Sequence, residues 1–84
     1  MIFCTTLNIT PGNYKKAIRQ FKAPVIPEGV KIRDFLWMFG VPDAFIIFEA
    51  TDEPTAGEFV IQFGDIAEVK TSVVFPIDDL RWVP

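Results

Sequence analysis

A dense run of apolar residues, broken by one turn signal, constrains this fold more than any other feature of the sequence. The run is DFLWMFGVPDAFIIFEA, residues 34–50, and it holds only three charged residues. A membrane-spanning helix needs about 20 consecutive apolar residues, whereas Gly40 and Pro42 interrupt this run in its middle. Glycine and proline between two strand-like segments indicate a tight connection. The run is therefore predicted to be an antiparallel hairpin, and no membrane segment is expected.

Strand and helix patterns alternate before the hairpin. Residues 2–9 alternate as a first strand. Thr10 and Pro11 suit the N-cap and the first position of a helix. The apolar side of that helix is predicted to be Tyr14, Ala17, Ile18 and Phe21, and its polar side Lys15, Lys16, Arg19 and Lys22. The loop at 23–29, with two prolines and a glycine, then leads to the hairpin.

The hairpin is followed by a second helix and a last strand. Strands are predicted over 30–39 and 44–51. Asp52 is the expected N-cap of a helix that Gly64 ends, and residues 67–77 form the last strand. Pro76 lacks an N–H to donate, so this strand is expected at a sheet edge or to end there.

This order of elements, β-α-β-β-α-β, predicts the fold class. It is the ferredoxin-like α+β arrangement, in which a four-stranded antiparallel sheet carries two helices on one face. Eighty-four residues suffice for one such domain, so residues 1–84 are expected to form a single unit.

The predicted sheet is apolar on both faces, although two helices cover only one. Strand 44–51 presents Ala44, Ile46 and Phe48 on one face and Phe45 and Ile47 on the other. Strict alternation in strand 30–39 sets Phe35, Trp37 and Phe39 opposite Ile32, Leu36 and Met38. In strand 67–77, Val73, Val74 and Phe75 are interpreted as covering both faces. An open face normally carries polar residues, so we expect a homodimer packed sheet against sheet, with Leu80 and Trp82 docked on a neighbour.

Charge and composition exclude several classes of function. The net charge is −3 and the basic residues are dispersed, so nucleic-acid binding is not expected. The single cysteine, Cys4, forms no intrachain disulfide, and without histidine neither a metal site nor a cofactor is expected. No signal-peptide pattern opens the sequence, and we expect a cytoplasmic protein.

Two segments resemble a known family. FGVPDAFIIFEATDEPTAGEF, residues 39–59, and GDIAEVKTSVVFPI, residues 64–77, are similar to GYD-type and DUF3303-type domains of the dimeric α+β barrel superfamily. The resemblance implies a homodimer. The chemistry stays open, because the superfamily includes monooxygenases, muconolactone isomerases and chlorite-dismutase-like domains. A histidine associated with the second strand of the DUF3303 type is absent, since residues 35–37 read FLW.

Without histidine, acid–base chemistry would rest on carboxylates. Glu49, after an apolar strand, is expected to be partly buried with a raised pKa. Asp34 is expected to oppose Glu49 or to pair with Arg33 or another base. The alternative is that both are solvated or ion-paired strand-end charges. Trp37 and Tyr14 are candidate ligand contacts, and core packing is the alternative for both.

Two hypotheses of function follow from the sequence. The first is an uncharacterised homodimeric protein that binds a small apolar ligand or a protein partner. The second is a cofactor-independent isomerase or monooxygenase for a small aromatic or polyketide-like compound, with Glu49 or Asp34 as the base.

Overall fold

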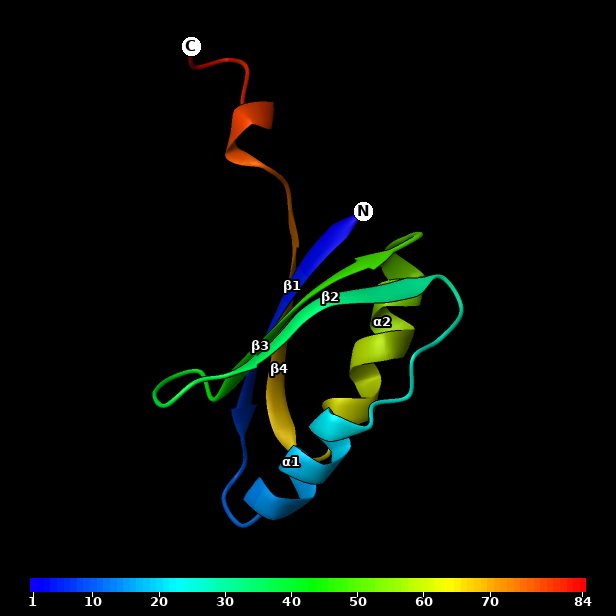
Figure 1. Cartoon of the computed structure of the whole chain (residues 1–84), viewed down its shortest axis with the longest axis vertical. Coiled ribbons are helices and arrows are strands. Elements are labelled where there is room, and N and C mark those ends of the chain that lie inside the picture. The colour runs from blue at the N-terminus through cyan, green and yellow to red at the C-terminus, as the bar shows by residue number, and fades with distance from the viewer.

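The computed structural model describes residues 1–84 and confirms the predicted ferredoxin-like α+β fold (Figure 1). The elements are β1 (Ile2–Ile9), α1 (Tyr14–Lys22), β2 (Val30–Trp37), β3 (Ala44–Ala50), α2 (Glu53–Val60) and β4 (Ala67–Val74), with short 3-10 helices η1 (Ile61–Phe63) and η2 (Ile77–Asp79). The strands form one antiparallel sheet in the order β2-β3-β1-β4. No helix is long and apolar enough to cross a membrane.

Both helices lie on the same side of the sheet, which we call the inner face (Figure 1). Phe48 of β3 stacks on Phe3 of β1 and meets Phe59 of α2 edge-on, with ring centroids 4.9 Å apart. Phe63 in η1 continues this packing to Phe21 of α1, at 5.5 Å. Burying one such ring contributes about 1.5–3 kcal/mol. A continuous aromatic core therefore joins the two helices to the central strands.

A β-bulge in β2 decides which of its side chains face the helices. Ile32 pairs with Phe48 and the next pair is Asp34 with Ile47, so Arg33 is the extra residue. Phe35 therefore lies on the inner face with Ile32, and the prediction from strict alternation is wrong for this strand. Without the bulge, Asp34 would have pointed towards the core, where an unpaired carboxylate is costly.

The first helix begins later than predicted. Thr10 is not its N-cap, because its backbone N–H and its hydroxyl both bond to Ile66 O, at 3.0 and 3.1 Å. The chain then turns at Gly12, whose φ of 87° favours glycine, and α1 starts at Tyr14. Asp52, in contrast, caps α2 as predicted: its side chain accepts a hydrogen bond from Thr55 N at 2.9 Å.

The second and fourth strands are shorter than predicted because their partners end. Trp37 pairs with Ala44, the first residue of β3, and Val74 pairs with Ile2, the first residue of β1. The edge position of β4 is confirmed. Its outer face is mostly polar, contrary to expectation, since register places Glu68, Lys70 and Ser72 there with Val74.

Asp43 ties the central hairpin to the first strand. Its carboxylate Oδ2 accepts a hydrogen bond from Ile9 N at 2.8 Å, and its own N–H donates to Leu7 O at 2.9 Å. Its carbonyl accepts from Met38 N at 2.7 Å, which closes the hairpin. One residue thus fixes the turn, the start of β3 and the end of β1.

We expect Asp43→Ala to lower the free energy of unfolding by about 1–3 kcal/mol, because Ile9 N–H loses a charged acceptor. Asp43→Asn keeps an acceptor oxygen and should lose less. The exposed Asp65→Ala serves as the control, with a change within about 0.5 kcal/mol. Urea denaturation measures all three, and equal losses for Asp43→Ala and Asp65→Ala would contradict the role given to Asp43.

Candidate functional site

An apolar cavity of about 300 Å³ lies between α1 and the sheet edge formed by β2. Six of its seven lining residues are hydrophobic; the lining consists of Ile18, Phe21, Lys22, Phe35, Leu36, Trp37 and Ala44. A second hollow of about 240 Å³ between α2 and β4 is more polar, since Glu53 and Thr71 line it. The first cavity is therefore the stronger candidate for a ligand site.

The walls of the α1–β2 cavity follow from two local features of the sequence. The bulge at Arg33 brings Phe35 and Trp37 to the inner face. Ala44, the partner of Trp37 in β3, has only a methyl group, so it leaves space beside the indole ring. Phe21 of α1 adds a further ring to the lining, with its centroid 5.1 Å from that of Phe35. Large rings beside one small residue thus produce the void.

Lys22 is the one charged residue that lines the cavity. It is exposed and lies in the last turn of α1, a helix with four cations and no acidic residue. Lys15 and Ile18 precede it at helical spacing, so they lie along the same side of α1. The mouth of the cavity is therefore electropositive, in a chain whose net charge is −3.

The cavity opens at the β2 edge of the sheet. Two of its lining side chains on the inner side are partly accessible there: Ile18 is 36% exposed and Trp37 39%. Leu36 also lines the cavity at this edge, although register places its side chain on the outer face. A ligand in this cavity would have aromatic walls on the inside and solvent, or another chain, on the outside.

The sequence predicts two candidate ligand contacts, Trp37 and Tyr14, and only Trp37 lies at the cavity. Trp37 lines it and stays a candidate ligand contact. Tyr14 does not: it lies one helical turn before Ile18, is 45% exposed, and is absent from the lining.

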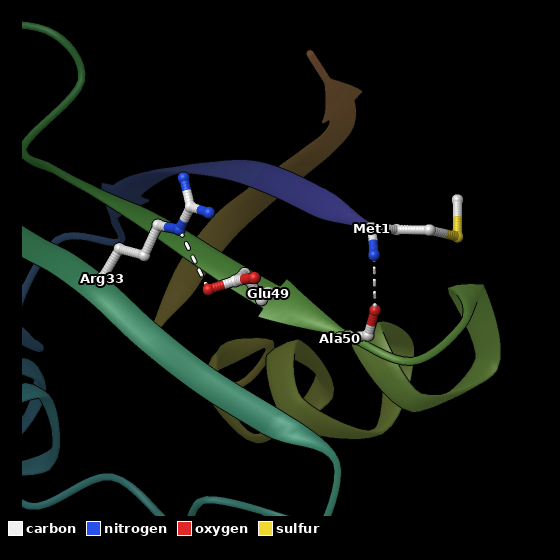
Figure 2. A network of polar contacts seen from close by, with 4 residues as sticks. All are labelled: Met1, Arg33, Glu49 and Ala50. Atoms are coloured by element: carbon white, nitrogen blue, oxygen red, sulfur yellow. Dashed lines mark hydrogen bonds and ion pairs between the residues drawn. The ribbon is translucent and has the colours of Figure 1, made fainter. Parts of the chain in front are cut away.

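Glu49 and Asp34 lie on the opposite, outer face of the sheet, away from the cavity. Glu49 pairs in register with Ile2 and Lys31, and Asp34 with Ile47, so the two carboxylates are not opposed. Arg33 Nε donates to Glu49 Oε2 at 3.0 Å (Figure 2). Both side chains are well exposed, at 45% and 40%. The alternative of an ion-paired strand-end charge is thus the one observed for Glu49.

The expectation of a raised Glu49 pKa is wrong. The hydrogen bond and the charge of Arg33 hold the pKa of Glu49 below its ordinary value, with a smaller contribution from Lys31. A lowered pKa stabilises the fold at pH values above the ordinary pKa, and this contribution is lost as the pH falls through the folded-state pKa. Glu49 is therefore ionised at neutral pH.

The acidic and cysteine side chains form no group of three that could bind a metal ion.

The outer face has an apolar centre, which we call the outer patch. Register places on this face Ile2, Cys4, Leu36, Phe45, Ile47 and Val74. Ile47 and Cys4 are paired neighbours at its middle. Polar residues flank the patch, among them Lys70 on β4 and the Arg33–Glu49 pair. The sheet is thus apolar on both faces in β3, as predicted, while its β4 edge is polar on the outside.

Of the seven lining residues, only Trp37 was identified from the sequence as a candidate ligand contact. Phe35 seemed to lie opposite Ile32 because the bulge was not recognised. Lys22 was assigned to the polar side of its helix, and Ala44 to one face of its strand. The spacing of Val30, Ile32, Phe35 and Trp37 contains a signal for the bulge, since one step is three residues instead of two. No local signal marks Lys22.

One comparison with known proteins identifies the chain. A family model described as "Domain of unknown function (DUF3303)" matches residues 1–83. This match confirms the resemblance drawn from residues 39–59 and 64–77, and the fold is consistent with the dimeric α+β barrel superfamily. No curated protein matches the chain.

We expect NMR titration of the Glu49 carboxyl carbon to give a pKa below the ordinary value for glutamate. Arg33→Met should move it upwards, because both the hydrogen bond and the nearest positive charge are lost. Lys31→Met serves as the comparison and should move it less, since Lys31 acts through charge alone. A Glu49 pKa above the ordinary value would restore the original expectation of a tuned base.

Proposed function

The chain belongs to the DUF3303 family, and we propose that this member is a homodimeric protein that binds a small, flat aromatic molecule with one anionic group. The observation that carries the proposal is the cavity between α1 and β2, with six apolar lining residues and one lysine at its mouth.

The size and lining of the cavity define the class of ligand. Its volume of about 300 Å³ is at the small end of ligand sites and suits a molecule of one or two rings. Phe35 and Trp37 offer aromatic surfaces on which a flat ring stacks. Lys22 offers a single charged donor, so a carboxylate, sulfonate or phenolate at the rim fits better than a cation.

The same lining favours binding over acid–base catalysis. The cavity contains no carboxylate, thiol or hydroxyl group, and Glu49 and Asp34 lie on the other face of the sheet. Catalytic roles for these two carboxylates stay predictions, and no feature of the cavity favours them.

The outer patch supports the homodimer. Phe45 and Ile47 are only partly covered by their neighbours, because no helix packs over this face. A two-fold axis through this face would place Ile47 and Cys4 of one copy near those of the other. Burial of apolar surface contributes about 25 cal/mol per Å². Packing of the outer patch against the same patch of a second copy would therefore stabilise a dimer.

The ligand proposal is tested with two dyes that share rings but differ in charge. We expect 1-anilinonaphthalene-8-sulfonate, an anion, to bind saturably with one site per chain, and neutral N-phenyl-1-naphthylamine to bind more weakly. Lys22→Met should weaken the anion about two- to fivefold and leave the neutral dye unchanged. Fluorescence titration at two salt concentrations measures both.

Lys16→Met is the matched control, because Lys16 lies on the same helix but does not line the cavity. It should change neither dye. Ala44→Ile fills the void with a residue suited to a strand, and it should abolish binding of both dyes while circular dichroism reports an unchanged fold. Equal effects of Lys22→Met and Lys16→Met, or full binding by Ala44→Ile, would contradict the site.

The dimer is tested by a charge placed in the outer patch. Ile47→Lys should shift the chain from dimer to monomer in sedimentation equilibrium, since a desolvated lysine at the centre of an interface is costly. Val25→Lys, at a loop position that is 73% exposed, should leave the dimer intact. A wild-type chain that is monomeric at micromolar concentration would overturn this part of the proposal.

A further inference from the structure

The last ten residues form an apolar arm that the monomer leaves uncovered. After Val74 the chain leaves the sheet and projects away from both helices (Figure 1). Four of its large side chains are well exposed: Phe75 at 58%, Ile77 at 76%, Trp82 at 75% and Val83 at 68%. The arm is ordered by its own hydrogen bonds, from Asp79 N to Pro76 O and from Leu80 N to Ile77 O, both at 3.0 Å. We refer to residues 75–84 as the arm.

The arm of one chain does not reach the cavity of the same chain. The arm leaves from β4 and the cavity lies at β2, and these strands form opposite edges of the sheet. They are also at opposite ends: Val74 pairs with Ile2, whereas Trp37 pairs with Ala44 and Ala44 with Leu7. The two sites therefore occupy diagonally opposite corners, so any arm at the cavity comes from another chain.

The arm and the mouth of the cavity are complementary in polarity and in charge. The mouth presents Ile18 and Trp37, partly exposed, beside the cations of α1. The arm presents Ile77, Leu80 and Trp82 around two consecutive acids, Asp78 and Asp79. The arm also carries one cation, Arg81, but its two acids leave it net negative, whereas the residues of α1 at the mouth are cationic, so the two surfaces are complementary in charge.

We propose that the arm of a second copy covers the mouth of the α1–β2 cavity, with Trp82 against Ile18 and with Asp78 and Asp79 near Lys15, so that Lys22 stays free to bind the ligand. The inference rests on the proposed homodimer and adds to it a site completed by the partner. In a closed dimer the exchange is reciprocal, so each chain covers the cavity of the other. A ligand would then lie between its own aromatic walls and a lid from the partner.

Disulfide cross-linking tests this placement directly. In a Cys4→Ser background, Ile18→Cys and Trp82→Cys are combined in one chain and oxidised mildly. We expect a covalent dimer on a non-reducing gel, because the two thiols meet between chains. The control pair is Ile61→Cys with Trp82→Cys, since Ile61 lies in η1 and is 77% exposed, and it should give no covalent dimer. Lys22→Cys, at an exposed residue that also lines the cavity, replaces Ile18→Cys if the latter variant does not fold.

Charge exchange gives an independent measurement. Asp78→Lys with Asp79→Lys should shift the dimer towards monomer, and adding Lys15→Glu should restore the dimer. Glu58→Lys with Asp65→Lys changes the net charge equally at exposed sites away from the arm, and should leave the dimer unchanged. An unaltered dimer in the first variant, or a disrupted dimer that Lys15→Glu does not restore, would overturn the contact.

The outcomes separate this inference from the proposed function. A wild-type dimer that binds dye but gives no Ile18–Trp82 cross-link, or an equal yield from the Ile61 pair, overturns the arm placement and leaves the ligand site standing. An Ile18–Trp82 disulfide formed within one chain would also overturn the arm placement. A cross-linked dimer without dye binding supports the arm and contradicts the ligand proposal. A monomer contradicts both the dimer and the arm.

Discussion

Two short helices have to cover a four-stranded sheet, and the rest of the structure depends on how much of the sheet they leave uncovered. Helices of nine and eight residues cover the inner face only in part, with Phe21 beside Phe35 of β2 and Phe59 beside Phe48 of β3. They leave the outer face bare, a cavity at the β2 edge, and an arm with no surface of its own. Apolar side chains gather in the cavity, on the arm and at the centre of the outer face, so the covering constraint supports both the proposed partner and the proposed ligand.

The bulge in β2 connects this architecture to the candidate site. A single extra residue, Arg33, moves Phe35 and Trp37 to the helix side and Asp34 to the outside. The same residue, freed from the ladder, pairs with Glu49. One local irregularity therefore builds the aromatic wall of the cavity, prevents burial of a carboxylate, and holds the pKa of Glu49 down. The aromatic wall of the cavity therefore lies on the inner face, and the Arg33–Glu49 ion pair lies on the outer face.

The fold could be predicted from the sequence because its elements are strongly patterned and its turns are marked by Pro and Gly. The site could be predicted only in part. Trp37 was identified, but Phe35 and Ala44 depend on a register that strict alternation does not reveal, and Lys22 depends on where α1 lies over β2. Glu49 was misjudged because its apolar neighbours suggested burial, whereas the sheet has no helix on that side and Arg33 is within 3.0 Å. Single-residue alternation thus predicts elements well and three-dimensional neighbours poorly.

The central claim, that the α1–β2 cavity is the binding site, is tested most directly by NMR of isoleucine methyl groups during titration with 1-naphthoate. Ile18 lines the cavity, while Ile47 lies in the outer patch and Ile61 on the exposed side of η1. The account predicts a saturable shift of the Ile18 methyl signal, with the signals of Ile47 and Ile61 unchanged. Saturable shifts of Ile47 with none at Ile18 would contradict it and place the ligand on the other face of the sheet.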